Sequence, residues 1–404
     1  MHSNCVYETP CPDLPDHHIP ILSSGWHIGV IYGPHGAPDF FSEDYIAKIF
    51  ASSWKVHHNA NRLGVRLIGP TPSWTRTDGG EAGLHPSNIH NCEYAIGTVN
   101  FTGDSPVIIA VDGPSLGGLV CPITIVQAEL WKMGQVRPGD TIRFVRITHD
   151  EARQMRLQQN DVIDSVGLSR MYAYDNENSI GHYVHNWLKP ATTRNYEFDA
   201  ILDSIPATDT TPAIAVRAQG DANVLMEYGE NVLDVDLRLC VWVFMKWIAK
   251  YISSHPECGL GEISPGVRSV QIQYDTRKTT IIKVLSIIRK CTYTSVDKLV
   301  IPCRKIRLPL AFDDHWTHDA IERYMSTVSA TAPYVPSNVD FAARINGLES
   351  RQQVLDIMLQ STYLVLGLGD VYLNAPCAVA IDPRHRLVTS KYNPTRSYIL
   401  RKVR

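Results

Sequence analysis

The chain has 404 residues, which is room for two or three domains of ordinary size. Hydrophobic residues make up 44% and charged residues 20%, so we expect a packed core and exclude global disorder. The 38 Lys and Arg residues are balanced by 41 Asp and Glu residues, and no dense basic run occurs. This balance argues against a nucleic acid or an anionic membrane surface as a partner held by charge.

The N-terminus is polar and lacks the uninterrupted apolar stretch of a signal peptide. The most apolar helical segment, Leu239 to Ile252, is interrupted by two lysines and is too short to span a bilayer. The nine cysteines are odd in number, widely spaced and without a Cys-x-x-Cys motif. That pattern favours free thiols in a reducing compartment over a disulfide scaffold or a zinc site, so we expect a cytoplasmic protein without a membrane partner.

The first 150 residues predict a loose lead-in followed by short strands. Residues 1–25 are rich in proline and show little periodicity. Residues 26–150 predict a β-barrel or sandwich, because short strands alternate with glycine and proline turns. Ser42 is expected to cap a helix, and 124–133 could form a short helix. The expected strands are His27–Ile31, Val65–Ile68, Ala95–Val99, Val107–Val111 and Thr141–Val145.

Residues 151–215 contain polar runs and are expected to form a linker that is ordered only in part. Residues 216–309 then predict a ferredoxin-like split βαβ domain, since strand and helix periodicities alternate in that order. The expected elements are the strand Asn223–Tyr228, the helix Asp234–Ser253, the hairpin Gly259–Ser264 with Val267–Tyr274, the helix Thr279–Lys290 and the closing strand Ile301–Leu308.

The last part of the chain, residues 310–404, predicts two helices among glycine and proline turns. They are expected at Thr317–Met325 and Ser350–Ser361. The segment from Arg384 to Arg404 is strand-like.

Four segments combine glycines with polar side chains at a density that ordinary turns seldom reach. Glycines let the backbone approach a ligand closely, and a loop with several free N–H groups can bind an anion. Each segment also has a plain structural interpretation: a glycine turn with solvated histidines, a barrel corner, or a surface ion-pair cluster. The four segments are 79–90, 112–118, 367–373 and 382–394.

Several chemistries lack their sequence motifs. No Gly-x-Gly-x-x-Gly helix-opening loop is present. No His-Glu-x-x-His motif occurs, and the adjacent His57 and His58 would face opposite sides of a strand. We therefore expect no metal site.

The order of long motifs along the chain resembles the carboxyltransferase region of urea carboxylases and urea amidolyases. Segments of the first half look like the KipA-like (allophanate hydrolase subunit 2-like) unit: His27–Phe41, Asn61–Pro70, Gly79–His90, Val107–Gly118, Ala128–Gln135 and Arg137–Asp140. Segments of the second half look like the KipI-like (subunit 1-like) unit: Leu225–Gly229, Pro265–Ser269, Arg344–Leu348, Gly367–Tyr372, Asp382–Val388 and Lys391–Pro394.

This resemblance implies an α+β, β-rich fold, with cyclophilin-like β-barrel units on either side of the ferredoxin-like domain. The implied domains are a KipA-like barrel at 26–150, a linker at 151–215, a KipI-like α/β domain at 216–309 and a KipI-like barrel at 310–404. Relative to the family, the chain begins midway through the first unit and stops short of the last glycine-rich segment. We therefore expect the first and last barrels to be incomplete.

The resemblance also implies a reaction in which carboxybiotin transfers its carboxyl group to urea, giving allophanate. The chain has no Met-Lys-Met biotin attachment motif, no ATP-binding glycine loop of a biotin carboxylase and no Gly-Ser-Ser-Gly amidase loop. Carboxybiotin would thus arrive on a separate carrier domain, with the biotin carboxylase and carrier components on other chains. A homo-oligomer is possible, and no covalently bound cofactor is expected.

Site residues follow from the resemblance and from the chemistry of a neutral planar substrate. Asn88, Asp112, Asp370 and Asn393 are expected to bind the substrate. Lys391 and Arg384 are expected to stabilise the developing oxyanion, and His85 to act as a base or an orienting group.

Departures from the family pattern leave alternatives open. Asn91 stands where the family has Asp, and Ala110-Val111 replaces a Gly-Pro pair. The chain could thus be a degenerate urea amidolyase-like protein with a binding or regulatory role. A third alternative is a component of an oxoprolinase-type amide hydrolase.

Overall fold

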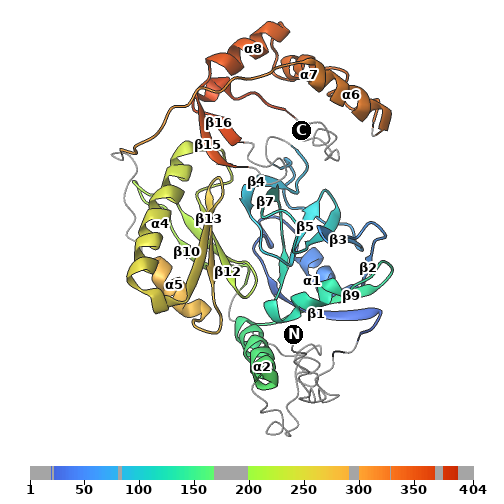
Figure 1. Ribbon diagram of the computed structural model, residues 1–404, viewed down its shortest axis with the longest axis vertical. Helices are drawn as coiled ribbons and strands as arrows, with labels where there is room; N and C mark the ends of the chain where they lie inside the picture. The colour runs from blue at the N-terminus through green and yellow to red at the C-terminus, as the bar shows by residue number, and fades with distance from the viewer. Residues whose placement is uncertain are drawn as a thin grey trace, which may run out of the picture. The chain divides into compact units, whose positions relative to one another are not determined.

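The computed structural model describes residues 20, 22–80, 84–167, 199–290, 300–327, 329–368 and 376–389. The chain divides into two compact units, Met1–Val296 and Asp297–Arg404. In the first unit the described residues form a β-barrel and a five-stranded sheet, and in the second they form helices and a two-stranded sheet (Figure 1). The fold is thus α+β and β-rich, as the sequence predicts.

The barrel is closed, so the prediction of an incomplete first barrel is wrong. Its strands follow the order β1-β8-β5-β6-β3-β2-β9, and β9 returns to pair in parallel with β1 over Gly25–Val30. The closing strand thus lies within the chain itself, which leaves no barrel edge open. The strands are β1 Gly25–Tyr32, β2 Trp54–Val56, β3 Gly64–Ile68, β5 Thr98–Thr102, β6 Ser105–Ile109, β8 Ile123–Ile125 and β9 Thr141–Arg146.

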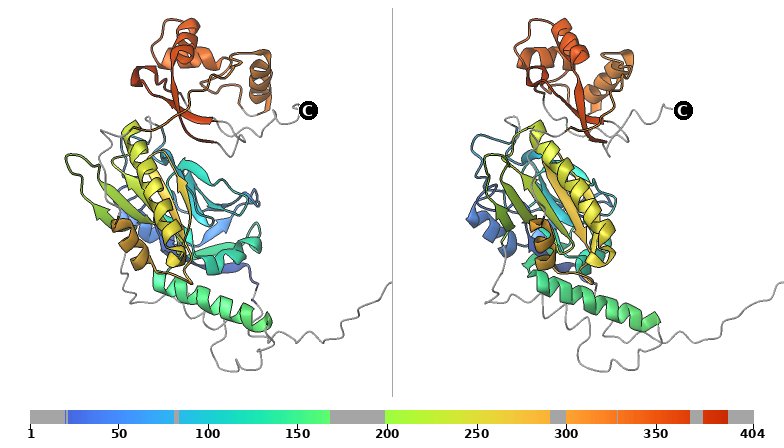
Figure 2. Two further views of the ribbon diagram at one scale, coloured as in Figure 1. Left: turned by 60° about the vertical axis from the view of Figure 1, so that its left-hand side comes forward. Right: turned by 90° about the vertical axis from the view of Figure 1, so that its left-hand side faces the viewer.

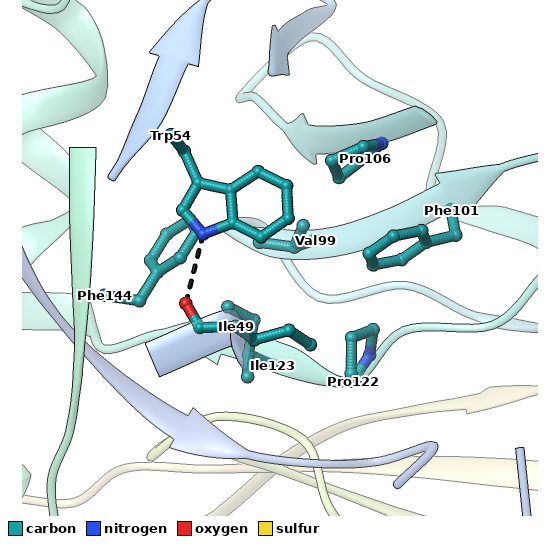
Figure 3. Close-up of a pocket in the computed structure, with 8 residues that line it drawn as sticks. All are labelled: Ile49, Trp54, Val99, Phe101, Pro106, Pro122, Ile123 and Phe144. Carbon is teal, nitrogen blue, oxygen red and sulfur yellow. Dashed lines mark hydrogen bonds between the residues drawn. The ribbon is translucent and has the colours of Figure 1, made fainter. Parts of the chain in front are cut away.

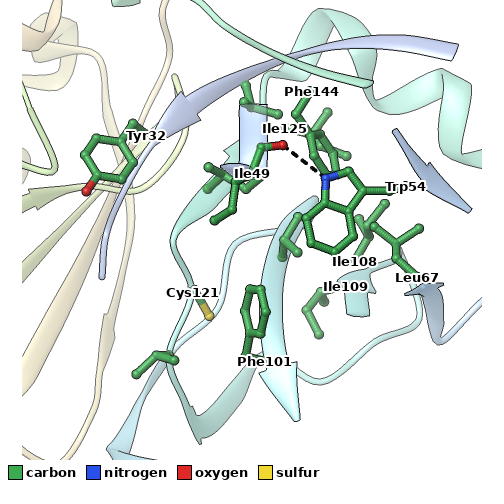
Figure 4. Close-up of a cluster of buried hydrophobic side chains, with 14 of the residues drawn as sticks. Tyr32, Ile49, Trp54, Leu67, Phe101, Ile108, Ile109, Cys121, Ile125 and Phe144 are labelled. Atoms are coloured by element: carbon green, nitrogen blue, oxygen red, sulfur yellow. Dashed lines mark hydrogen bonds between the residues drawn. The ribbon is translucent and has the colours of Figure 1, made fainter. Parts of the chain in front are cut away.

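The helix α1, Glu43–Ala51, lies against the barrel as the apolar spacing predicts. The Ser42 hydroxyl caps it by accepting a hydrogen bond from the Tyr45 N–H at 3.2 Å. Trp54 is fully buried, and its indole N–H donates to the Ile49 carbonyl at 3.1 Å (Figure 4). This bond satisfies the polar atom of the largest side chain in the core.

Apolar side chains fill the centre of the barrel (Figure 3). The gap between them is too narrow for a water molecule, so the barrel interior is a packed core and not a ligand site. The lining residues are Ile49, Trp54, Val99, Phe101, Pro106, Pro122, Ile123 and Phe144.

Several elements of the first unit lie outside the barrel strands. Strands β4, Asn88–Glu93, and β7, Leu116–Leu119, pair with each other as a two-stranded ribbon. A 3-10 helix, Gln127–Gly134, occupies most of the segment for which a short helix was expected. Helix α2, His149–Gly167, extends into the segment expected to be a partly ordered linker, and the linker stays a prediction. The domain boundaries themselves stay predictions.

The five-stranded sheet has the order β10-β11-β12-β14-β13. The chain order β12, α4, β13, β14, α5 confirms the predicted split βαβ core. The strands are β10 Ile201–Ile205, β11 Ile214–Ala218, β12 Asn223–Tyr228, β13 Leu260–Pro265 and β14 Ser269–Tyr274. The helices are α4 Val235–Ser254, the 3-10 turn Pro256–Cys258 and α5 Ile281–Arg289.

The predicted closing strand Ile301–Leu308 is wrong, because residues 300–312 form neither helix nor strand. The place beside β12 is taken by β11, which pairs antiparallel with β12 over Ile214–Ala218. A four-residue connection joins these two strands, so β11 reaches this edge at a far lower loop-closure cost than a segment beyond α5 would. Alternating apolar residues at 306, 308 and 310 explain why the sequence suggested a strand.

Side chains alternate across this sheet, and one face is apolar. Val216, Val224, Met226, Val270 and Ile272 are fully buried in a cluster with residues of α4 and α5. Figure 2 shows α4 (yellow) lying across the sheet on this side. The opposite face carries polar and charged residues and meets the barrel.

The second unit contains both predicted helices, and they are confirmed as α6 and α8. Helix α7 was not predicted, although Ser337 caps it and Asp340 lies in its first turn. Residues 383–385 form a 3-10 turn where a strand was expected, and residues 390–404 lie outside the described part. The partial barrel expected here stays a prediction. The elements are α6 His315–Thr327, α7 Asn338–Ile345, α8 Arg351–Gln360, β15 Tyr363–Leu368 and β16 Pro376–Ala380.

A glycine that touches Trp54 tests the packing of the barrel. A Cβ atom at Gly69 would lie 2.2 Å from the Trp54 ring, so Gly69→Ala should destabilise the protein by about 1–3 kcal/mol through overpacking. Gly134→Ala is the control, because nothing lies within 4 Å of its added Cβ. Guanidinium unfolding followed by tryptophan fluorescence measures both. Equal stability of the two variants would contradict this description of the core.

Candidate active site

The β4–β7 ribbon joins two of the glycine-rich segments. Asn88 pairs with Leu119, and Cys92 pairs with Gly117. A Cβ atom at Gly117 would lie 2.4 Å from the Tyr94 ring, so the packing of this ring against β7 requires glycine there. The segments 79–90 and 112–118, distant in sequence, thus form one structure.

His85 lies in the turn before this ribbon, with both ring nitrogens engaged. Its Nδ1 accepts a hydrogen bond from the Ser87 N–H at 3.2 Å and lies 3.0 Å from the Ser87 hydroxyl. Because Nδ1 accepts, Nε2 carries the proton of the neutral ring, and it lies 3.5 Å from Asp104. Asp104 also accepts from the Trp74 indole at 2.9 Å. The ring is therefore oriented rather than freely rotating.

Asn88 begins β4 and is 8% exposed. Its side-chain amide donates to the main-chain carbonyl of His85 at 3.0 Å. The main-chain carbonyl of Asn88 accepts from the Arg76 guanidinium at 2.8 Å. A Cβ atom at Gly80 would lie 2.7 Å from that same carbonyl oxygen. Hence Gly80, His85 and Asn88 pack into one tight turn.

Two other predicted site residues, Asp112 and Arg384, form exposed ion pairs. The Asp112 carboxylate forms an ion pair with Arg62 on the surface. Arg384, in the second unit, binds the neighbouring Asp382 at 2.5 Å and has an 86% exposed side chain. Asp370, Lys391 and Asn393 lie outside the described residues. Among the four predicted residues within the described part of the chain, the structure brings His85 and Asn88 into direct contact.

The polar face of the sheet meets the barrel along a seam that the sequence analysis missed. Glu93, at the end of β4, is 1% exposed. Its carboxylate accepts hydrogen bonds from the Ser269 hydroxyl at 2.7 Å and from the Gln271 N–H at 3.3 Å. Burial raises the pKa of this carboxyl to about 7, against the lowering effect of these hydrogen bonds and of the nearby Arg238 charge.

A second buried glutamate in the seam has the opposite surroundings. Glu227 of β12 binds Arg217 at 2.5 Å and Arg268 at 2.8 Å, and all three side chains are less than a tenth exposed. Burial opposes ionisation, but the charges of Arg268 and Arg217 outweigh it and lower the pKa of Glu227 to about 2. The motifs Leu225–Gly229 and Pro265–Ser269 contain two members of this triad, and a charged residue within an otherwise apolar strand was the available signal.

Two family models match most of the chain. The model of carboxyltransferase domain subdomains A and B matches residues 4–146, and the model of subdomains C and D matches residues 214–402. The chain belongs to the carboxyltransferase domain family. The first matched segment includes the whole barrel, and the second begins at β11.

Several relatives that match nearly the whole chain are urea amidolyases or urea carboxylases. The urea amidolyases of Saccharomyces cerevisiae and Lachancea kluyveri are 41% and 42% identical over 96% and 97% of this chain. A crystal structure of Kluyveromyces lactis urea carboxylase covers 95% of the chain with 41% identity and a TM-score of 0.78. The chain spans 20% and 21% of the two amidolyases and 33% of the urea carboxylase chain.

Within the described residues, no helix is long and apolar enough to cross a membrane. The same residues contain no group of three or more His, Cys, Asp or Glu side chains that could hold a metal ion.

Glu93 predicts an unusual dependence of stability on pH. Its folded-state pKa of about 7 exceeds its ordinary value of 4.5, so the folded protein binds the proton more tightly than the unfolded chain does. The contribution of Glu93 to the free energy of unfolding should therefore fall as pH rises from about 4.5 to about 7, by on the order of 3 kcal/mol.

The Glu93→Gln variant should lack this contribution, because glutamine does not titrate, so its unfolding free energy minus that of the wild type should change with pH over this range. Glu262→Gln changes an exposed glutamate of β13 and should keep it. Guanidinium unfolding at a series of pH values measures both. A slope that persists unchanged in Glu93→Gln would show that another group binds the proton.

Proposed function

We propose that this chain carries out the carboxyl-transfer step of a urea carboxylase. The bond between N1 of biotin and its carboxyl group breaks, and the carboxyl carbon forms a new bond to a urea nitrogen. That nitrogen loses one proton, biotin N1 gains one, and the product is allophanate. The observation that carries this proposal is similarity to urea amidolyase and urea carboxylase over nearly the whole chain, since both family models and the TM-score agree with it.

Asn88 and His85 are the residues whose contacts best support a role. Urea is neutral and planar, so it suits amide and carboxylate partners more than cations. Asn88 is held on both sides, by Arg76 at its carbonyl and by His85 at its side chain, so it would offer a preorganised contact. Because both nitrogens of His85 are engaged, we favour an orienting role for it over that of a general base.

The remaining site residues keep their proposed roles. Asp112, Asp370 and Asn393 are proposed to contact the substrate, while Lys391 and Arg384 would stabilise the oxyanion that develops on biotin. For Arg384 this requires exchange of its bond to Asp382 for a bond to the substrate. Such an exchange is inexpensive, because exposed ion pairs contribute little.

Carboxybiotin is a substrate of this chain in the proposed reaction, delivered on a carrier domain. We propose that biotin carboxylase and biotin carrier components supply it, as the lengths of the urea amidolyases leave room for such parts. Several of the described cysteines are free thiols, which supports the expected reducing, cytoplasmic location; among them are Cys92, Cys121, Cys240, Cys258 and Cys303.

Substitution of Asn88 tests the proposal directly. The chain is combined with biotin carboxylase and biotinylated carrier, and transfer of labelled carboxyl groups from bicarbonate to urea is measured. Asn88→Ala should lower kcat/KM for urea by about tenfold or more, because one hydrogen bond to the substrate is lost. Asn59→Ala, which changes an exposed asparagine, should retain the wild-type rate.

Three other outcomes would count against the proposal. Full activity of Asn88→Ala would remove that residue from the site. A wild-type chain that folds but transfers nothing would favour the degenerate, binding or regulatory alternative. ATP-dependent opening of a cyclic amide in place of urea carboxylation would favour the oxoprolinase-type alternative.

A further inference from the structure

The seam between barrel and sheet is polar although it is buried. Arg217 on β11, Glu227 on β12 and Gln271 on β14 project from the same sheet face, because side chains alternate along each strand. Burying a charge is costly unless the group is hydrogen-bonded or paired, so each of these charged groups needs a partner in the folded protein.

Arg217 connects the sheet to the barrel. Its Nε donates to Glu227 at 2.5 Å within the sheet. Its Nη2 donates to Asp39 at 2.9 Å, and its Nη1 to the Pro34 carbonyl at 3.4 Å, both in the loop after β1. A single planar guanidinium thus joins elements that are 178 residues apart in the chain.

The contacts continue from Arg217 to the candidate site. The Arg217 guanidinium lies 5.7 Å from the centre of the Phe40 ring, and the Arg76 guanidinium lies 5.9 Å from it. Arg76 then donates to the carbonyls of Pro86 at 3.2 Å and Asn88 at 2.8 Å. The route from Glu227 to Asn88 therefore runs through Arg217, Phe40 and Arg76 without a break.

We propose that Arg217 is a positioning residue for carboxyl transfer, which sets the place of Asn88 relative to the sheet through Phe40 and Arg76. The proposal rests on the proposed function of the chain. Arg217 itself touches no substrate. Its role is to hold the turn Pro86–Asn88 at one position, so that the urea-side contact is preorganised.

Two neighbours make Arg217 suited to this role. Arg268 binds the second oxygen of Glu227 and also donates to the carbonyls of Tyr228 and Gly229, so Glu227 cannot follow if Arg217 moves. His35 packs edge-on against Phe40 at 5.0 Å, and its Nδ1 accepts from the Cys121 N–H at 2.9 Å. Burial lowers the pKa of His35 to about 3, so this support for Phe40 stays uncharged at neutral pH.

Arg217→Lys tests the proposal, because lysine keeps the charge but cannot bond Glu227, Asp39 and Pro34 together. We expect the KM for urea to rise about tenfold and the KM for the carboxylated carrier to stay unchanged. Amide hydrogen exchange of β4 should become faster, while that of α4 and α5 stays as in the wild type. Arg289→Lys is the control. Arg289, at the end of α5, donates two hydrogen bonds to Asp203 of β10, which belongs to the same sheet but lies away from the seam.

A second variant keeps the test decisive if Arg217→Lys does not fold. Phe40→Leu removes the ring between the two arginines and leaves the Arg217–Glu227 pair in place, so it should raise the KM for urea in the same way. Wild-type urea KM and wild-type exchange of β4 in either folded variant would overturn the positioning role while the proposed function stands. A wild-type chain that transfers no carboxyl group would overturn both.

Discussion

A carboxylate shared by two arginines in the seam between barrel and sheet determines how the first unit is assembled. Removing three charges from water costs several kcal/mol per ion, and the cost is offset only when each group is bonded. Glu227 meets this condition through Arg217 and Arg268, and Arg217 places its other donors on the barrel loop. A sheet shifted by one residue against the barrel would leave these charges unpaired, so the network selects one arrangement.

Two buried glutamates in the same seam illustrate how surroundings decide protonation. Glu227 faces two cations, which lower its pKa to about 2, whereas Glu93 has mainly neutral donors and a pKa of about 7. The first carboxylate is charged at neutral pH, so its ion pairs with Arg217 and Arg268 persist there. The second changes charge near neutrality, on the strand that begins with Asn88. The seam therefore combines one fixed contact with one titratable contact.

Local elements of the fold were predictable, and non-local ones were not. The helices around Tyr45, Val241 and Ile287 follow from apolar spacing and from the caps Ser42, Asp234 and Thr280, which act over a few residues. The closure of the barrel and the strand beside β12 depend on which distant segments pair. An apolar alternation such as that of 301–308 indicates only a capacity to form a strand, not a partner for it.

The sequence by itself determined the family, the glycine-rich segments and the residue types that they carry, because these are read in chain order. It identified His85 and Asn88, which lie three residues apart and meet in one turn. Only the tertiary structure decided that 79–90 and 112–118 share a ribbon, and that Glu93, Arg217 and Glu227 are buried. The contacts that cross the seam join segments more than 100 residues apart, so they cannot be read from the spacing within one segment.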